Sequence, residues 1–218
     1  MTHVEIIWTV VVGGGSGQRF GLRKQYEALG DQRVIDWSRR VAAASSDGVV
    51  VVVPAEDSDR EQAVPGGSSR SASVRAGLDA VPPEATIVCV HDAARPFATQ
   101  EIYARVVSAV ASGADAAIPG VEVTDTIKVV ASAGDGSAVV VDTPDRATLV
   151  AVQTPQAFRA SALRAAHGAG GEATDDAAMI ERVGGRVVVV AGEITNRKIT
   201  VPDDLDWARG LVESGAMT

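Results

Sequence analysis

Residues 6–24 read IIWTVVVGGGSGQRFGLRK, and this stretch decides the fold. The apolar run Ile6–Val12 is rich in β-branched residues, which favours a buried strand. Four of the five residues in Gly13–Gly17 are glycine, so backbone N–H groups can turn inward around phosphate. Arg19 and Lys24 add two cations to this loop. The stretch predicts a strand followed by a loop that holds a nucleoside triphosphate; the alternative is a flexible turn without a ligand.

The loop differs from the familiar phosphate-binding and nucleophile motifs. The Gly-Lys-Ser/Thr ending of a P-loop is absent, and Gln18 stands where the dinucleotide fingerprint has its third glycine. The glycines around Ser16 lack the spacing of a serine nucleophile elbow. The loop therefore points to a different class of nucleotide-binding protein.

Beyond this loop, β-type runs alternate with helical patterns. We expect further strands at Gly48–Val53, Thr86–Val90, Ala114–Pro119 and Arg186–Val190, and helices at Val34–Ala44, Ser71–Ala80, Gln100–Ala111, Ala162–His167, Asp175–Val183 and Asp203–Glu213. Thr99, Thr174 and Thr200 occupy expected N-cap positions, and Pro202 suits a first helical turn. The alternation predicts an α/β fold with a Rossmann-like, mainly parallel sheet and helices on both faces.

Residues 121–153 break the alternation. Three runs are β-like and no helix separates them, while a turn is expected at Gly134–Ser137; the runs are Glu122–Val130, Ala138–Asp142 and Thr148–Gln153. We expect a β-arm that projects from the sheet. Because there is no linker or repeat, the chain is interpreted as a single domain spanning residues 1–218.

Composition limits the function classes. The net charge of −8 argues against a nucleic-acid-binding protein, because phosphate backbones select basic surfaces. The run Ile6–Val12 is too short for a signal peptide or membrane span, so a cytoplasmic protein without a membrane partner is expected.

Cys89, the only cysteine, lies in an apolar run and is expected to be a buried thiol. Only three of the 20 basic residues are lysine (Lys24, Lys128 and Lys198), which marks sites needing a compact ammonium or reflects chance.

Further candidate residues follow the expected strands, where an open parallel sheet binds its ligands. Asp92 could bind Mg²⁺ shared with phosphates, or could accept N–H groups of its own loop. His91 is expected to be packed or hydrogen-bonded rather than a ligand. The segment Pro65–Val74 offers N–H and O–H donors to a ligand, or is simply a capped helix start. Lys198 lies at a strand-to-helix junction, where it binds phosphate or stays solvated.

Taken together, these segments resemble the 2-C-methyl-D-erythritol 4-phosphate cytidylyltransferases of the non-mevalonate isoprenoid pathway, from Val10 to about Ala208. The resemblance rests on Gly13–Gln25, Gly66–Val74, Val90–Pro96, Thr124–Lys128, Asp145–Arg146, Val152–Gln156, Thr174–Ala177 and Lys198–Thr200. It implies a fold of the nucleotide-diphospho-sugar transferase type. It also implies Mg²⁺-dependent cytidylyl transfer from CTP to a sugar-alcohol phosphate, in a homodimer that exchanges its arms.

The resemblance also assigns roles to individual residues. Catalytic roles on the phosphates of CTP are implied for Arg19, Lys24 and Lys198. Nucleotide-binding roles are implied for Gly13, Gly14, Gly15, Gly17, Gly67, Ser73, Asp92 and Ala93, with Asp92 also the metal ligand. Binding of the acceptor is implied for Thr126, Arg146, Thr174 and Arg95, and Arg146 would act on the neighbouring subunit's site.

The sequence departs from the family at the first loop. Gly13-Gly14-Gly15 replaces the usual Ala-Ala-Gly, Arg23 replaces a proline, and the spacing from Arg19 to Lys24 is two residues shorter than in many relatives. Three alternatives remain open: ribitol 5-phosphate as the acceptor, GTP as the nucleotide, and a non-catalytic nucleotide-binding protein of the same fold.

Overall fold

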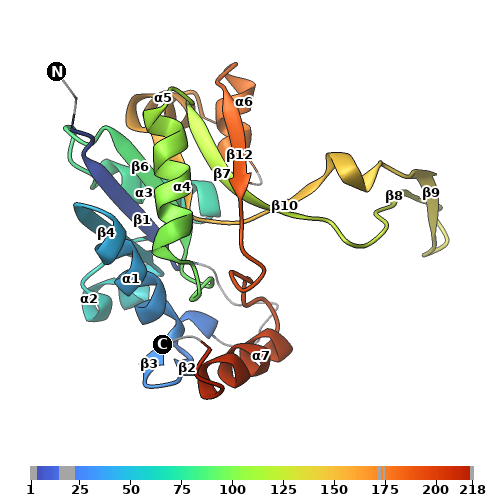
Figure 1. Ribbon diagram of the computed structural model, residues 1–218, viewed down its shortest axis with the longest axis horizontal. Helices are drawn as coiled ribbons and strands as arrows, with labels where there is room; N and C mark the ends of the chain where they lie inside the picture. Colours follow the sequence, from blue (N-terminus) through green and yellow to red (C-terminus); the bar gives the residue numbers. More distant parts are fainter. Residues whose placement is uncertain (1–3, 15–22, 171–172, 174, 217–218) are drawn as a thin grey trace.

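An eight-stranded mixed sheet forms the centre of the protein (Figure 1). The structure is a computed structural model that describes residues 4–14, 23–170, 173 and 175–216. The strand order is β10-β7-β11-β6-β1-β4-β5, and β12 pairs with β7. The strands are β1 (Ile7–Val12), β4 (Gly48–Val53), β5 (Val64–Pro65), β6 (Ile87–Asp92), β7 (Ala116–Glu122), β10 (Val150–Val152), β11 (Gln156–Arg159) and β12 (Val187–Ala191).

The five strands expected from the sequence are confirmed, and they pair in parallel as a mainly parallel sheet requires: β1 pairs with β4 and β6, and β12 pairs with β7. Strand β11 was not predicted, and it runs antiparallel between β6 and β7. Its four residues are too short to give a periodic pattern, and polar Gln156 and Arg159 form its ends. The sheet position, and not the local sequence, makes this segment a strand.

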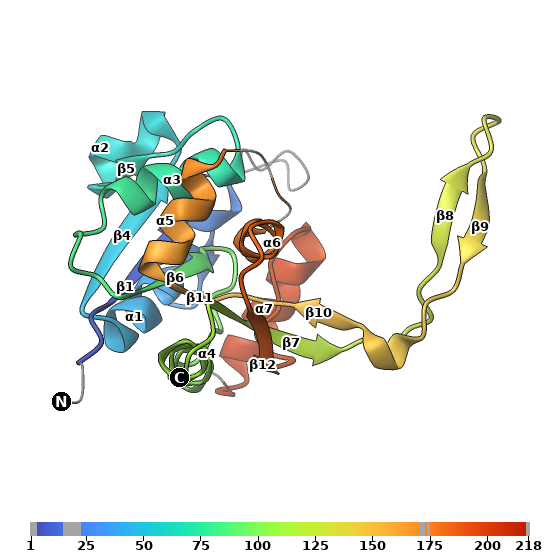
Figure 2. The same cartoon turned by 90° about the horizontal axis from the view of Figure 1, so that it is seen from above.

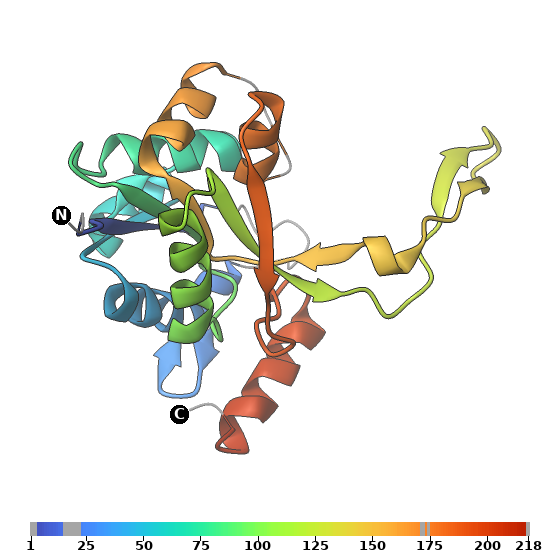
Figure 3. The same cartoon turned by 45° about the horizontal axis from the view of Figure 1, so that its top comes forward.

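Helices cover both faces of the sheet, as predicted (Figure 2). Helices α3 (Arg70–Asp79), α5 (Ala160–Gly168) and α6 (Asp176–Arg182) pack on one face, where Val74, Leu163 and Ile180 join the core. Helices α1 (Val34–Ser45) and α4 (Gln100–Ala111) pack on the other, with Ile35 and Val106 in the core. Figure 3 shows the sheet between these layers. None of the helices in the described ranges is long and apolar enough to cross a membrane.

Two of the three predicted threonine caps are wrong. Thr99 caps α4 and accepts a hydrogen bond from the Ile102 N–H at 3.2 Å, as expected. Helix α6 is capped by Asp175, which follows Thr174. Helix α7 (Pro202–Glu213) begins with Pro202, but its N-cap is Val201 and not Thr200. At α6 the Asp175 carboxylate accepts a hydrogen bond from the Ala178 N–H, because aspartate is as good a cap as threonine. At α7 the carboxylate of Asp204, in the first turn of the helix, accepts from the N–H groups of Thr200 and Val201.

Helix α7 closes a smaller apolar cluster below the sheet. Leu205 and Ala208 of α7 pack with Trp37, Phe97 and Ile199 in this cluster. Nearby lie the turn of 3₁₀ helix η1 (Lys24–Tyr26) and the short hairpin of β2 (Ala28–Leu29) and β3 (Gln32–Arg33). The remaining short elements, η2 (Ala55–Asp57) and α2 (Ser58–Glu61), follow β4. The C-terminal helix thus fixes the segment that carries Lys198 against the sheet.

The predicted arm is present and projects away from the sheet (Figure 2). Strand β7 continues outward, the ribbon of β8 (Val129–Ser132) and β9 (Ala138–Asp142) forms the tip, and β10 returns to the sheet. Gly134 and Gly136 have φ angles of +84° and +88° in the turn, a conformation that favours glycine. A single 3₁₀ turn, η3 (Arg146–Thr148), interrupts the β-structure of the arm.

Candidate active site

Two cavities lie side by side at the carboxyl ends of the central strands, and Arg70 lines both. Ligands of open α/β sheets bind at this edge, because the loops that follow the parallel strands meet there. Arg70 is the first residue of α3, so its position is fixed by the packing of that helix on β1 and β4. We call these two cavities the glycine-loop cavity and the Asp92 cavity.

The glycine-loop cavity has a volume of about 540 Å³. Its lining comes from the ends of β1, β4 and β5 and from the start of α3: Val12, Gly14, Arg23, Pro54, Ala55, Glu56, Gly66, Gly67, Ser68, Ser69, Arg70 and Ser73. Most of this lining is backbone and small side chains. Such a surface offers N–H and C=O groups to a flat polar ligand such as a nucleotide base and its ribose.

Buried Ser73 shapes the wall of this cavity. Its hydroxyl accepts a hydrogen bond from the Gly67 N–H at 3.1 Å and donates to the Ser69 carbonyl at 2.9 Å. A Cβ atom on Gly67 would lie 2.5 Å from the Ala72 Cβ, and one on Gly14 would lie 3.0 Å from the Ser73 Oγ. The wall therefore needs glycine at 67, and Gly14 brings the loop after β1 against α3. The structure places the predicted residues Gly14, Gly67 and Ser73 together.

The Asp92 cavity has a volume of about 340 Å³ and is strongly polar. Its lining comes from β6, from the segment before β11 and from the segment after β12: Arg70, Asp92, Arg95, Val152, Gln153, Thr154, Gln156, Asp175 and Lys198. Three cations and two carboxylates thus face one space. This composition suits an anionic ligand that also carries hydroxyl groups.

Asp92 is the electrostatic centre of this cavity. Its carboxylate lies 2.6 Å from the Lys198 Nζ and 3.3 Å from the Arg70 Nε. Burial would raise the pKa of Asp92, but the charges of Lys198 and Arg70 outweigh it and hold that pKa well below its ordinary value. Asp92 was expected just past the end of its strand, but it is the last residue of β6. The carboxylate is therefore ionised and holds Lys198 over the cavity.

The neighbouring loops fix these side chains through buried hydrogen bonds. The Thr154 hydroxyl accepts from the Asp92 N–H at 3.0 Å and also contacts the His91 Nδ1 at 3.0 Å. The other nitrogen of His91 lies 3.2 Å from the Arg95 carbonyl. His91 is fully buried, so the prediction of a packed, hydrogen-bonded histidine is confirmed.

Arg95 is held in place by two backbone carbonyl groups. Its guanidinium donates to the Asn196 carbonyl at 2.8 Å and to the Val152 carbonyl at 3.2 Å. Asn196 in turn donates to the Thr154 carbonyl at 2.8 Å. These bonds join the loop after β6, the base of the arm and the segment before Lys198. The Asp92 cavity therefore depends on three parts of the chain that are far apart in sequence.

The other predicted site residues lie in different places. The backbone N–H of Gly13 donates to the Val52 carbonyl, and that of Ala93 donates to the Val12 carbonyl. These bonds hold both residues against the ends of the central strands. Lys24 is half-buried at the start of η1, where its charge helps to lower the pKa of Asp204. Gly15, Gly17, Arg19 and Thr174 lie outside the described residues.

The arm residues Thr126 and Arg146 are not brought to the cavities of their own chain. Both are exposed, and Arg146 donates to the Thr124 carbonyl at 2.8 Å within the arm. Figure 2 shows the arm extending away from the strand ends that form the site. In the described structure neither residue lines the Asp92 cavity.

The described residues offer Mg²⁺ the two carboxylates of the Asp92 cavity, Asp92 and Asp175, and no preformed cage. No group of three or more His, Cys, Asp or Glu side chains in the described ranges could hold a metal ion. Mg²⁺ often binds through one or two carboxylates together with substrate phosphates. Asp92 fits that requirement, although its oxygens contact Lys198 and Arg70 in the ligand-free protein. The residues therefore fit a metal that arrives with a triphosphate.

Sequence reasoning assigned no role to Arg23, Arg70 or Gln156. Arg23 forms ion pairs with Glu56 and Asp57, so the arginine that replaces the family's proline fastens η1 to the loop after β4. Arg70 lies in a motif that was quoted only for its glycines and serines. Gln156 donates to Asp175 at 2.9 Å, while its buried Oε1 has no partner in the described structure. The signal available for Arg70 was its position in a Gly/Ser-rich segment, and that for Gln156 was its position in the motif Val152–Gln156.

The sheet topology and the paired cavities at its carboxyl edge define an α/β protein of the nucleotidyltransferase type. Residues 7–214 match the model of the family described as 2-C-methyl-D-erythritol 4-phosphate cytidylyltransferase. The chain belongs to this family.

Individual relatives agree with this assignment. The 2-C-methyl-D-erythritol 4-phosphate cytidylyltransferase of Rhodococcus jostii is 46% identical over 222 residues, which cover 95% of each chain. The crystal structure of 4-diphosphocytidyl-2C-methyl-D-erythritol synthase from Anaerococcus prevotii has a TM-score of 0.83 and 27% identity, and the match covers 96% of each chain.

A second group of relatives is longer. The bifunctional enzyme IspD/IspF of Anaeromyxobacter dehalogenans is 42% identical over 235 residues. That match covers 100% of this chain but 60% of the relative. The chain therefore spans about three fifths of the length of this bifunctional relative.

Proposed function

We propose that the protein transfers the cytidylyl group of CTP to 2-C-methyl-D-erythritol 4-phosphate, giving 4-diphosphocytidyl-2-C-methyl-D-erythritol and pyrophosphate. The observation that carries the proposal is the pair of cavities that share Arg70. The glycine-loop cavity suits the nucleoside, and the polar Asp92 cavity suits a sugar-alcohol phosphate. Family membership favours this reaction over ribitol 5-phosphate as the acceptor and over a non-catalytic nucleotide-binding role.

The reaction needs cations more than it needs a base. An oxygen of the acceptor's phosphate forms a bond to the α-phosphorus of CTP, and the bond from that phosphorus to the bridging oxygen of pyrophosphate breaks. The nucleophile is already an anion at neutral pH, so no proton has to be removed. The barrier lies in bringing two anions together in line and stabilising the charge that spreads over the transition state.

The chain places its cations accordingly. Lys198 is fixed by Asp92, and Arg70 lies between the two cavities, where both reacting phosphates would meet. Arg19 and Lys24 would add charge from the glycine loop, as in the family. Mg²⁺, when bound with CTP, would neutralise part of the triphosphate charge, and Asp92 is the carboxylate that would hold it.

We further propose that the protein acts as a homodimer in the cytoplasm and that the arm carries Thr126 and Arg146 to the partner's acceptor site. The arm supports this, because seven of its valines are between 36% and 59% exposed in the single chain: Val129, Val130, Val139, Val140, Val141, Val150 and Val152. A projecting apolar ribbon of this kind is typical of an interaction surface.

One assay tests the proposed reaction. Purified protein and Mg²⁺ are offered each of the four nucleoside triphosphates with either methylerythritol phosphate or ribitol 5-phosphate, and pyrophosphate is measured. We expect release with CTP and methylerythritol phosphate alone. Release with ribitol 5-phosphate would contradict methylerythritol phosphate as the acceptor, and release with GTP would contradict CTP as the nucleotide. No release with any pair would contradict the proposal that the protein is an enzyme of this kind. Omission of Mg²⁺ in the active pair tests the metal.

A further inference from the structure

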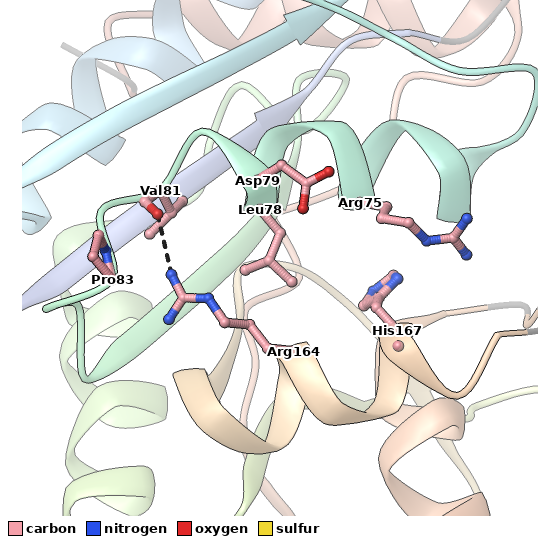
Figure 4. A pocket seen from close by; sticks show the side chains of 8 residues that line it. Arg75, Leu78, Asp79, Val81, Pro83, Arg164 and His167 are labelled. Atoms are coloured by element: carbon pink, nitrogen blue, oxygen red, sulfur yellow. Dashed lines mark hydrogen bonds between the residues drawn. The ribbon is translucent and has the colours of Figure 1, made fainter.

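A third cavity lies between α3 and α5, apart from the residues of the two cavities described above (Figure 4). Its volume is about 420 Å³. Four polar or charged side chains line it together with three apolar residues and a glycine: Arg75, Asp79, Arg164, His167, Leu78, Val81, Pro83 and Gly168. None of these side chains has a role in the proposed reaction. We call this space the α3/α5 cavity.

Two buried polar atoms at this cavity lack partners. The Nε of Arg75 and the Nδ1 of His167 make no hydrogen bond within the described part of the chain. His167 is 4% exposed, and Figure 4 shows its ring on α5 facing Arg75 on α3. Native proteins pair nearly all buried polar groups, with protein, water or a ligand. A polar group bound in this cavity would give both of these atoms a partner.

The contacts of His167 and Arg75 indicate which chemical group this cavity could bind. The Nε2 of His167 lies 3.0 Å from an Asp176 carboxylate oxygen, so this nitrogen carries a proton and donates it. The Nδ1 on the other side can therefore share one further proton with a ligand, while Arg75 supplies a positive charge. A phosphate group meets both demands, because it offers acceptor oxygens to the guanidinium and an oxygen that shares a proton with Nδ1.

The remaining lining limits the size and charge of the ligand. Arg164 donates to the Val81 and Pro82 carbonyl groups at 3.1 Å and 3.0 Å, which fixes a second cation beside the cavity. Asp79 adds a negative charge and disfavours a polyphosphate. The apolar side chains of Leu78 and Val81 favour a short carbon substituent. These features together suit a phosphomonoester.

A buried row of charges connects this cavity to the Asp92 cavity. Beyond His167, the Asp176 carboxylate contacts the Arg70 Nη1 at 2.7 Å, and the Arg70 Nε lies 3.3 Å from Asp92. Asp176 is completely buried. Burial would raise the pKa of Asp176, but the hydrogen bond from His167 and the charge of Arg70 hold it below its ordinary value. Asp176 therefore divides one negative charge between His167 and Arg70.

We propose that the α3/α5 cavity binds the phosphate group of a phosphomonoester and that His167 and Asp176 transmit its presence to Arg70. A proton shared at Nδ1 makes the imidazole a stronger partner for Asp176. Asp176 then holds Arg70 less strongly, and Arg70 shifts its interaction toward Asp92. The phosphate site stands by itself, while its link to Arg70 rests on the proposed function.

Side-chain nitrogen NMR tests the site directly, because the chain has only three histidines. The full-length protein is titrated with butyl phosphate, inorganic phosphate and pyrophosphate. We expect a saturable shift of the His167 Nδ1 signal, tightest for butyl phosphate, and a dissociation constant raised about tenfold in Arg75→Gln. Arg186→Gln, an exposed arginine before β12, is the matched control and should bind as the wild type does.

Three results of this titration would overturn the site. They are no saturable shift of His167, equal binding by Arg75→Gln and wild type, and inorganic phosphate or pyrophosphate binding at least as tightly as butyl phosphate. The last result would contradict the assignment to a monoester.

Turnover tests the link to Arg70. The kcat is measured at saturating CTP and acceptor, so that butyl phosphate does not compete in the reaction site. We expect butyl phosphate to change kcat by about two- to fivefold in the wild type and not in Arg75→Gln. Binding without any change in kcat would overturn the link. An inactive protein that still shows the His167 shift would contradict the proposed reaction and support the phosphate site.

Discussion

At the residue scale, the arrangement around Asp92 shows how a buried charge can position a cation for chemistry. The carboxylate has two cationic partners, Lys198 and Arg70, from distant parts of the chain. Lys198 remains 38% exposed, so its ammonium group faces the cavity while Asp92 fixes its direction. Lysine suits this position, because a compact ammonium concentrates its charge on one phosphate oxygen.

We predict that Lys198→Gln lowers kcat by about 10²- to 10³-fold, because it removes a fixed charge that stabilises the transition state. Steady-state release of pyrophosphate from CTP measures the effect. Arg186→Gln removes an exposed cation away from the site and should retain full activity. An unchanged kcat in Lys198→Gln would contradict a role of this lysine at the reacting phosphates.

The stability of the folded state depends on pH through His91. Burial, opposed in part by the charge of Asp92, lowers the pKa of His91 from 6.5 to about 4. In the unfolded chain the imidazole takes up a proton below pH 6.5, while in the folded protein it stays neutral down to about pH 4. The unfolded state therefore binds more protons in this window, and the stability of the fold is lost as the pH falls.

We predict that His91→Gln removes part of this dependence. Between pH 6.5 and pH 4, the slope of unfolding free energy against pH should decrease by up to about 1.4 kcal/mol per pH unit. Urea unfolding at several pH values measures both slopes, and the comparison uses slopes because the substitution also removes buried hydrogen bonds. Equal slopes for wild type and variant would show that His91 is not neutral in the folded protein.

At the scale of elements, the arm is the part of the chain that cannot be stable by itself. A two-stranded ribbon in water is marginally stable at best. The side chains of β8 and β9 are exposed along their whole length. Val130 and Val140 are directly opposite each other in the ribbon and are 56% and 53% exposed. A ribbon with this surface is expected to be covered by another copy of the chain.

We predict that the double variant Val130→Lys/Val140→Asp is monomeric. The two substituted residues are cross-strand neighbours of opposite charge, so the ribbon itself is retained while its apolar surface is lost. Sedimentation or light scattering gives the mass in solution. The matched control, Ser132→Lys/Ala138→Asp, introduces the same pair of charges at the tip and should remain dimeric. A dimeric Val130→Lys/Val140→Asp variant would exclude the arm as the interface.

At the scale of the whole molecule, the proposed acceptor site would combine residues from both chains of the proposed homodimer. The Asp92 cavity supplies Lys198, and the arm of the partner would supply Arg146. In a two-fold symmetric dimer both contacts occur twice, and each site combines the two chains.

We predict that inactive Arg146→Ala and Lys198→Gln subunits restore activity when mixed. Random pairing makes half of the dimers mixed, and each mixed dimer has one intact site, so about a quarter of wild-type activity is expected. The mixture is refolded together, and differently tagged subunits confirm the mixed dimers. Verified mixed dimers without activity would mean that Arg146 does not act on the partner's site.

The sequence alone determined the α/β class, the order of the main elements and the existence of the arm. Strands such as Ile7–Val12 and helices such as Gln100–Ala111 carry their own periodic patterns, because each buries one side of a regular repeat. The same local logic pointed to the segment Pro65–Val74 and to Asp92 at the carboxyl ends of expected strands, while the roles of Gly67 and Ser73 came from the family resemblance. The family resemblance supplied the nature of the nucleotide and of the acceptor.

Only the tertiary structure decided the features that have no local sequence pattern, namely strand β11 and the position of Arg70. Strand β11 exists because a space between β6 and β7 offers backbone partners on both sides. Arg70 became a site residue because α3 places it between Asp92 and Asp176, which are separated from it by 22 and 106 residues. Ion pairs across such separations depend on where whole elements pack, and a linear pattern carries no record of that packing. The glycine-rich stretch thus predicted the fold, while the packing of the sheet and its helices brought together the charges that line the Asp92 cavity.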